Sequence, residues 1–563
     1  MSAVDESLSF NVVDVLLREQ QKTTAVEKFA QLHDRHELPL QARYYRDLIP
    51  LGTPQPGQQY AFEVDLDACS GCKACVVACH SLNGLEQNEV WRQVGSLHGG
   101  CSDLPVIQHV TTTCHHCLEP ACLEGCPVRA YEKDPVTGIV RHLDDQCIGC
   151  QYCVFKCPYD VPKYSHDKGI VRKCDMCHDR LSSQEAPACV QSCPNEAIHI
   201  RIVDKQRIIE ESEANQFLPG APEPGYTLPT TLYKTARPLP RNLLPADYFS
   251  ARPQHGHLPL VFMLVLTQMS VGAFAIEQLM ALFTGWFRDG ADVVRLSHLV
   301  GALLLGLTGL AASLLHLGRP LYAYRAILGL RTSWLSREIL AFGAFAALAA
   351  IYTAVAWLDL RGMALPSLLQ NGLGGAAAVV GIVAVFCSVM VYADTQRAFW
   401  NSTYTFVKFF LTAALLGLPT VLLISLGAAA ASDELSVRGI MANYGQWLCG
   451  WLLVIGLAKL GFESLVFVHL QKRQHAPLKR TALLLTTELS MTTFKRYFFG
   501  FVGIVALPCL LMSESVVRSE NGFHTLFIAL AVGLMFVVLL IGEMTERYLF
   551  FRAVVAPKMP GTT

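Results

Sequence analysis

Cysteine spacing is the feature that most constrains what this chain can fold into. Seventeen of its 20 cysteines lie between residues 69 and 193, and all of these except Cys101 fall into four groups of four. The groups are Cys69, Cys72, Cys75 and Cys79; Cys114, Cys117, Cys122 and Cys126; Cys147, Cys150, Cys153 and Cys157; and Cys174, Cys177, Cys189 and Cys193. The first and third groups are compact, the second has a slightly longer gap before its third cysteine, and the fourth has an eleven-residue gap there. So many thiols at such short intervals predict metal–sulfur clusters.

The spacing is typical of [4Fe–4S] clusters. Three thiolates on a short turn reach three irons of one cube, and a fourth, further along and often followed by Pro, ligates the other cluster of a pair. Pro127, Pro158 and Pro194 follow three of the four groups. A disulfide framework is disfavoured by the tight spacing, and zinc ribbons need Cys-x-x-Cys pairs held further apart. The sixteen cysteines therefore predict four [4Fe–4S] clusters in two ferredoxin-like pairs.

Composition divides the chain into two unlike halves. The approximate repeat of strand, cysteine loop and short helix predicts an α+β, ferredoxin-like duplicated domain over residues 60–205. An N-terminal extension over 1–59 precedes it. A linker and docking tail over 206–257 follows it and is rich in proline, which favours an extended tether. Residues 258–555 are a succession of apolar runs, so we expect an all-α membrane bundle there.

Eight of these apolar runs are long enough to cross a bilayer. They lie near 258–284, 296–316, 337–358, 371–393, 404–427, 443–468, 497–515 and 524–547. An even number of spans places both ends of the chain on one side of the membrane. Nineteen Lys and Arg residues flank the spans on that side, against five on the other. The positive-inside rule thus predicts a multi-pass protein of the bacterial inner membrane, with the cluster domain and both termini in the cytoplasm.

The net charge and the N-terminal sequence bear on the kind of partner and on the location of the cluster domain. The net charge of −1 gives no bulk attraction for nucleic acid. The first residues carry acids where a signal peptide would carry positive charge, and no twin-arginine pair precedes the cysteines. The sequence therefore favours a cluster domain that stays in the cytoplasm, where thiols are reduced.

These motifs resemble subunits of dimethyl sulfoxide reductase-type complexes. The cysteine region is similar to their four-cluster iron–sulfur subunit, and the membrane half is similar to their eight-span anchor. The motifs that carry the second resemblance are Leu315-His-Leu-Gly-Arg-Pro320, Ser333-Trp-Leu-Ser-Arg-Glu338 and Gly542-Glu-Met-Thr-Glu-Arg547. The two are normally separate polypeptides, so this chain resembles their fusion.

The resemblance implies partners and ligand pairing that the spacing alone does not give. It implies a separate catalytic subunit that carries molybdopterin, and it likens Pro229-Thr-Thr-Leu-Tyr-Lys234 to a tail laid on that partner. It also implies that the first and fourth groups share two clusters and that the second and third groups share the other two. Cys79 would then ligate the cluster of the fourth group, and Cys193 that of the first.

The resemblance further implies a quinol site at His316 and Glu338. His316 ends the second apolar run and Glu338 opens the third, so both lie at the membrane face that carries the cluster domain. Ionisable residues in membrane segments are costly and usually functional. A menaquinol or ubiquinol that loses two electrons also loses two protons, which a His and a carboxylate can accept. The alternative is structural, with His316 at a helix end and Glu338 paired with Arg337 or Arg319.

The predicted function is electron transfer and membrane anchoring. The chain would relay electrons between the quinone pool and the molybdopterin subunit, in a quinone-linked oxidoreductase complex of anaerobic respiration. It would not itself convert the terminal substrate, and no haem is expected, because the resembled anchors lack it. The direction stays open between reduction of an S-oxide or oxyanion and oxidation of a substrate such as sulfite. The alternatives are a subunit of a hydrogenase or polysulfide reductase complex and a non-conducting scaffold.

Overall fold

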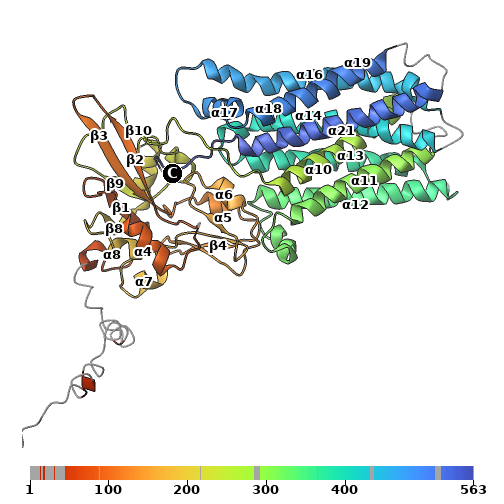
Figure 1. Ribbon diagram of the computed structural model, residues 1–563. Coiled ribbons are helices and arrows are strands. Elements are labelled where there is room, and N and C mark those ends of the chain that lie inside the picture. Colours follow the sequence, from red (N-terminus) through yellow and green to blue (C-terminus); the bar gives the residue numbers. More distant parts are fainter. Residues whose placement is uncertain are drawn as a thin grey trace, which may run out of the picture.

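The structure, a computed structural model, combines a region of small sheets with a bundle of long helices (Figure 1). It describes residues 45–87, 89–215, 217–283, 292–363, 365–431, 436–513 and 522–561, together with residues 13, 17, 18 and 31. Most of the predicted N-terminal extension lies outside these described residues. The predicted class, an α+β cluster domain followed by an all-α membrane bundle, is confirmed.

The central sheet of the cluster domain is built on β1 (Gln58–Asp65). β1 pairs antiparallel with β8 (Ile198–Asp204), with Phe62 opposite Ile200, and parallel with β9 (Leu232–Lys234) on its other edge. Six consecutive residues of β1 are buried. Such continuous burial indicates that both faces of the sheet are covered, in contrast to the alternation of a half-exposed strand.

Three smaller sheets complete the domain. β2 (Gln93–Gly100) pairs antiparallel with β3 (Pro105–Thr112) on one side and with β10 (Leu244–Pro245) on the other. β4 (Tyr131–Lys133) with β5 (Val140–His142), and β6 (Lys163–Ser165) with β7 (Ile170–Arg172), form two short hairpins. The chain passes from each of these two hairpins into the next cysteine group.

Short helices follow the cysteine loops. They are α4 (Ala74–Leu82), α5 (Ala121–Glu124), α6 (Tyr152–Lys156), α7 (His178–Ser182) and α8 (Ala188–Gln191). In α4, α5, α6 and α8, the third cysteine of a group is the second residue of the helix. Each group thus turns from a loop into a helix at the same ligand, and the sequence repeat is a structural repeat.

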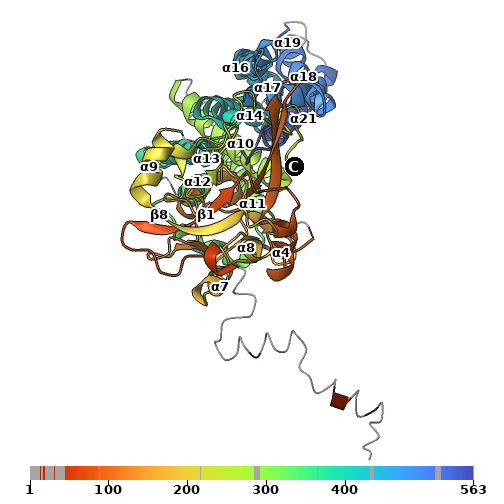
Figure 2. The same cartoon turned by 90° about the vertical axis from the view of Figure 1, so that its left-hand side faces the viewer.

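The proline-rich segment 206–257 lies along the cluster domain and supplies it with regular elements. Asp204 caps α9 (Lys205–Glu213) by accepting a hydrogen bond from Arg207 N. Further on, β9 and β10 each extend a sheet of the domain. The segment is therefore built into the domain at these points, and the residues expected to lie on a partner, 229–234, include the edge strand β9. Figure 2 views the molecule from the cluster-domain side, with the helix bundle behind it.

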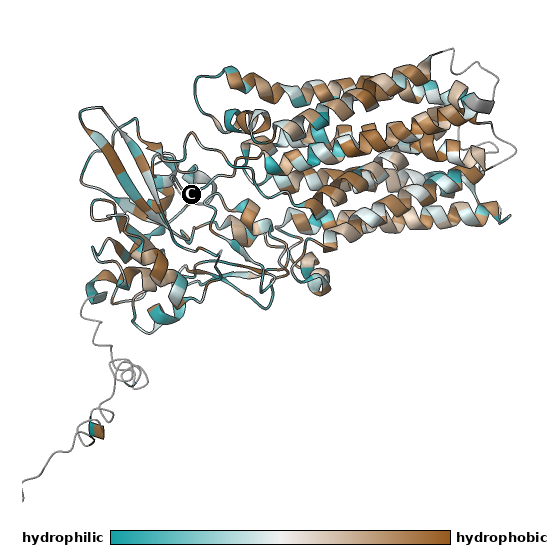
Figure 3. Ribbon diagram, in the orientation of Figure 1, coloured by the Kyte–Doolittle hydropathy of each residue, from teal (hydrophilic) through white to brown (hydrophobic). Residues whose placement is uncertain are grey.

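Within the described residues, eight helical segments are long and apolar enough to cross a membrane, as the apolar runs predict, and they form the bundle. They are α10 (Leu258–Phe283), α11 (Asp292–Leu314), α12 (Trp334–Leu360), α13 (Ser367–Ala393), α14 (Ser402–Ala430), α15 with η5 and α16 (Val437–Ile440, Met441–Gly445 and Gln446–Ser464), α18 with η7 and α19 (Ser490–Gly500, Phe501–Ala506 and Leu507–Met512), and α21 (Gly522–Arg552). α10 and α14 are the most buried. Large apolar side chains such as Leu304, Phe386 and Leu530 are exposed on the outer helices, and the residues of these helices are largely hydrophobic (Figure 3). The bundle therefore has the surface of a protein in contact with lipid.

The cluster domain and the bundle share one hydrophobic core. Tyr152 and Phe155 of α6 are buried in the same cluster as Phe274 and Phe342 of the bundle. The C-terminal residues return to the cluster domain, where Lys558 Nζ lies 2.8 Å from Asp247 Oδ2. The C-terminus and the cluster domain therefore lie at the same end of the bundle, which Figure 1 also shows.

Candidate functional site

The cysteines gather into four sets of neighbouring thiols. Three members of each set come from one sequence group and the fourth comes from another group. The sets are Cys69, Cys72 and Cys75 with Cys193; Cys174, Cys177 and Cys189 with Cys79; Cys114, Cys117 and Cys122 with Cys157; and Cys147, Cys150 and Cys153 with Cys126. The first and fourth groups thus exchange their last cysteines, and the second and third groups do the same.

Backbone conformation shapes the two compact loops in the same way. Gly71 and Gly149, which precede the second cysteine, have φ of 72° and 69°, and Lys73 and Gln151, which follow it, have φ of 64° and 59°. These left-handed residues fold the loop around a central point before the helix begins. Thiols so arranged on a tight turn suit three corners of an iron–sulfur cube.

Backbone amides point at several of the sulfurs. Ala130 N lies 3.2 Å from Cys126 Sγ, Met176 N lies 3.4 Å from Cys174 Sγ, and Ala197 N lies 3.3 Å from Cys193 Sγ. Amide donors to sulfur stabilise the thiolate form and raise cluster potentials. The donor set and its surroundings therefore fit [4Fe–4S] clusters.

Arg92 lies buried between two of the thiol sets, a position that the sequence did not indicate. It is close to Cys75, Cys79, Cys174 and Cys189, and its Nη1 donates to Thr111 Oγ1 at 3.2 Å. Its Nε and Nη2 have no hydrogen-bond partner among the described residues. A buried cation is costly unless negative charge compensates it, and anionic clusters in the two sets would supply that charge. A single Arg after Trp91 carries no motif, so only the fold reveals it.

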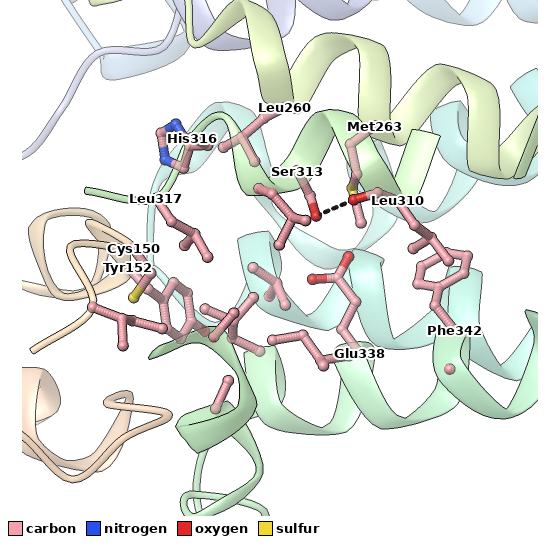
Figure 4. A pocket seen from close by; sticks show the side chains of 18 of the residues that line it. Cys150, Tyr152, Leu260, Met263, Leu310, Ser313, His316, Leu317, Glu338 and Phe342 are labelled. Carbon is pink, nitrogen blue, oxygen red and sulfur yellow. Dashed lines mark hydrogen bonds between the residues drawn. The ribbon is translucent and has the colours of Figure 1, made fainter. Parts of the chain in front are cut away.

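A cavity of about 290 Å³ lies between the cluster domain and the bundle. Its walls come from α6, α10, α11, α12 and α13, and they are mostly apolar. His316 and Glu338, the two residues predicted for a quinol site, both line it, and so does Cys150 of the third group. Figure 4 shows the Glu338 carboxylate at the centre of the lining, with His316 and Cys150 toward the cluster domain. Two ionisable groups and one of the clustered cysteines therefore line the same cavity.

Glu338 is buried in the first turns of α12 and is hydrogen-bonded to a hydroxyl group. Ser388 Oγ of α13 donates to its Oε1. The two arginines that could have formed an ion pair with Glu338 donate hydrogen bonds elsewhere. Arg337 donates to the backbone oxygens of Leu330 and Arg331, and Arg319 donates to Asp144 O. The carboxyl group thus faces the cavity with one neutral partner.

His316 lies just beyond the end of α11. Burial, together with the nearby His255, lowers the pKa of His316 to about 4. The imidazole is therefore neutral near pH 7. Its Nε2 is buried and has no hydrogen-bond partner among the residues that the structure describes. A neutral ring with an unused nitrogen can accept a proton from a bound molecule.

Close backbone contact fixes the His-Leu-Gly motif under the third cysteine loop. A Cβ atom on Gly318 would overlap Gly169 O, and one on Gly149 would overlap Gly169 O and approach Gly318 N. Arg319 N donates to Ile148 O at 3.1 Å. The absence of side chains at these glycines lets the anchor loop lie directly against the ligand loop.

A second set of ionisable residues is buried in the other half of the bundle. Its members are Lys408, Lys459, Glu463, Arg496, Glu543, Glu546 and Arg547. Arg496 Nε lies 2.9 Å from Glu463 Oε2, and its Nη2 lies 2.9 Å from Glu543 Oε1. Lys459 Nζ reaches the same two carboxylates at 2.6 and 3.1 Å. These contacts join α16, α18 and α21, and none of the seven residues lines the cavity.

Comparison with known families identifies both halves of the chain. Residues 254–552, more than half of the chain, match the family described as DMSO reductase anchor subunit (DmsC). Residues 106–202 match the 4Fe-4S dicluster domain family.

Individual relatives match the cluster domain. The B chain of the anaerobic dimethyl sulfoxide reductase of Haemophilus influenzae is 35% identical over 159 residues, which cover 27% of this chain and 77% of the relative. The protein of the same name from Escherichia coli K12 is 37% identical over 157 residues, 26% of this chain and 76% of the relative. Hydrogenase-2 operon protein HybA of Escherichia coli O157:H7 is 36% identical over 160 residues, 24% of this chain and 49% of the relative.

Proposed function

The chain belongs to the DMSO reductase anchor subunit family, fused to an iron–sulfur domain similar to the B chains of anaerobic DMSO reductases, and we propose that it connects the quinone pool to a molybdopterin-containing catalytic subunit. It is an electron-transfer and membrane-anchor subunit with iron–sulfur cofactors, and a multi-pass membrane protein.

Four [4Fe–4S] clusters form the proposed electron path, one in each set of thiols. Cys150 lines the cavity, so a cluster held by its set would take electrons from a molecule bound there, or give electrons to it. The next set includes Cys114, which neighbours Cys174 of the set after it. The last set includes the exposed Cys72. The path therefore ends at the protein surface, where the catalytic subunit would dock.

The cavity is the proposed quinol site. A bound menaquinol or ubiquinol supplies two electrons and two protons when it is oxidised. Glu338 accepts one proton at its free carboxylate oxygen, and His316 accepts the other at Nε2. The apolar walls exclude bulk water and hold the ring system, as in other small-molecule sites. With quinone as substrate, the same two residues donate the protons.

One observation carries this proposal: His316, Glu338 and Cys150 line the same cavity. The proton acceptors and the first electron acceptor therefore contact one bound molecule. Contact of this kind removes the need for a long electron step between the site and the clusters.

Substitution of the two acceptors tests the site. Glu338→Gln or His316→Ala is expected to slow reduction of the clusters by a quinol analogue by about 100-fold or more, the scale of a lost general base. Iron content and dithionite reduction should stay at the wild-type level. His475→Gln, which replaces a histidine that packs on Tyr248 and Phe249, serves as the matched control. Wild-type rates in both site variants would remove the proposed site.

The proposed orientation places the cluster domain and both termini in the cytoplasm, as the positive-inside rule favours. A cytoplasmic-type reporter fused after residue 563 should be active, and activity of a periplasmic-type reporter there would contradict this orientation. The relatives named as DMSO reductase B chains support a molybdoenzyme partner. The match to HybA keeps a hydrogenase partner as the second candidate. Mass spectrometry of the large subunit that copurifies with the tagged chain separates the two.

A further inference from the structure

Three histidines lie in a row between the cavity and the surface of the protein. His316 lines the cavity. Its ring centroid is 5.2 Å from that of His257, which is in turn 4.7 Å from that of His255. His257 is 9% exposed, whereas His255 is exposed to solvent. The row thus leads from a buried wall to water.

The surroundings of the middle histidine, His257, suit a residue that passes protons on. Phe155 and Phe551 pack against His257 at 5.1 and 5.6 Å between ring centroids, so bulk water is kept away from it. Its Nδ1 is buried and has no hydrogen-bond partner among the described residues, like Nε2 of His316. Two such orphaned nitrogens on adjacent rings leave room for a direct or water-bridged hydrogen bond.

We propose that His257 and His255 relay protons between the cavity and the water on the cluster-domain side of the membrane. This inference rests on the proposed quinol site. One ring nitrogen accepts a proton from His316 while the other releases one toward His255, so each imidazole returns to its neutral form after every transfer. A cluster held by the thiol set that includes Cys150 would take up the electrons separately, one at a time. In the opposite direction the same row delivers protons from water to the cavity.

The groups around His257 favour passing a proton on over holding it on the ring. His316, His255 and Arg397 are the titratable and charged groups that face it, and all of them disfavour a second positive charge. Burial and these neighbours lower the pKa of His257 to about 3. A proton on this ring is therefore short-lived, and the resting ring is neutral with one nitrogen ready to accept.

Substitutions of His257 and His255 in the full-length, cluster-loaded chain test the relay. His257→Phe, which keeps a ring in the apolar site, is expected to slow quinol-driven cluster reduction at least tenfold and to delay the release of protons measured with a pH dye in liposomes. His255→Gln at the exposed end should slow both less. Binding of a fluorescent quinol analogue should be unchanged, and so should reduction by dithionite. His475→Gln again serves as the control.

Chemical rescue distinguishes a relay from a structural role. Added imidazole should restore the rate of His257→Ala, where the missing ring leaves a space, and should not restore that of His257→Phe. Wild-type rates in His257→Phe while Glu338→Gln is blocked would overturn the relay and leave the quinol site standing. Wild-type rates in both would overturn the quinol site itself. Loss of analogue binding in His257→Phe, or no rescue by imidazole, would also count against the relay.

Discussion

Gly318 of the membrane anchor lies against Gly169 of the cluster domain so closely that a Cβ atom on either residue would overlap the backbone of the other. This contact joins the loop after the second span to the hairpin that precedes the fourth cysteine group. Tyr152 and Phe155 pack into the bundle beside it. The two halves of the chain are thereby held against each other beside the cavity.

The close contact between Gly318 and Gly169 predicts that position 318 does not tolerate a side chain. Gly318→Ala should destabilise the protein by about 1–3 kcal/mol, because backbone atoms must move apart to admit the methyl group. The measured midpoint of thermal unfolding should fall, and quinol-driven cluster reduction should slow. Gly375→Ala is the matched control, since no atom lies within 4 Å of the added Cβ. Its effect should be neutral or slightly stabilising in a helix, and equal effects of both variants would contradict the proposed role of the contact.

Exchange of the last cysteines can be tested by iron loss. We expect Cys193→Ser to affect the cluster held by Cys69, Cys72 and Cys75. Adding Cys69→Ser should then cause little further loss of iron, whereas adding Cys174→Ser should remove a second cluster. Iron content and electron paramagnetic resonance of reduced membranes measure this. Cys101→Ser is the control, because Cys101 is exposed and belongs to none of the four sets. Equal losses in the two double variants would refute the pairing.

Arg92 should set the potentials of two clusters. Removal of its charge in Arg92→Met is expected to lower the reduction potentials of the two adjacent clusters by roughly 40–90 mV, the equivalent of about 1–2 kcal/mol for one electron at an effective dielectric constant near 20. Redox titration followed by electron paramagnetic resonance measures the shift. Arg92→Lys keeps the charge and should shift the potentials much less. Unchanged potentials in Arg92→Met would show that the charge is compensated elsewhere.

The buried charge cluster should behave as one unit. Arg496→Met leaves the carboxylates of Glu463 and Glu543 without one cation, so we expect a loss of about 3–5 kcal/mol of stability. Combining it with Glu463→Gln removes an uncompensated charge and should recover part of that loss. Thermal unfolding of the purified protein gives both values. Additive losses in the double variant would mean that the two side chains act independently.

Acid should weaken the structure through His257. Its folded pKa of about 3 lies below the ordinary value near 6.5. The unfolded chain therefore binds the proton first, and stability falls as the pH drops below about 6.5. At pH 5 this one group costs about 2 kcal/mol. His257→Phe should flatten the decline in the unfolding temperature between pH 7 and pH 5, and His475→Gln should leave it as in the wild type. An unchanged decline in His257→Phe would exclude this histidine as its source.

Local pattern was enough for much of the architecture. The cysteine spacing predicted iron–sulfur loops because the ligands of one cube lie mostly on one turn. The apolar runs predicted the spans because a helix satisfies its own backbone in lipid. His316 and Glu338 could be singled out because they stand in motifs that resemble the anchor family, and ionisable residues in membrane segments are usually functional.

Tertiary structure alone decided which distant groups meet. The Lys459–Glu463 pair follows from helical spacing, but Arg496 and Glu543 join it only because three helices pack together. In the same way, Arg92 reaches two thiol sets, Gly318 meets Gly169, and His257 comes to stand between His316 and His255. Most of these contacts join residues that are far apart in the sequence, so they depend on how the helices and loops pack together. Local sequence patterns do not specify that packing.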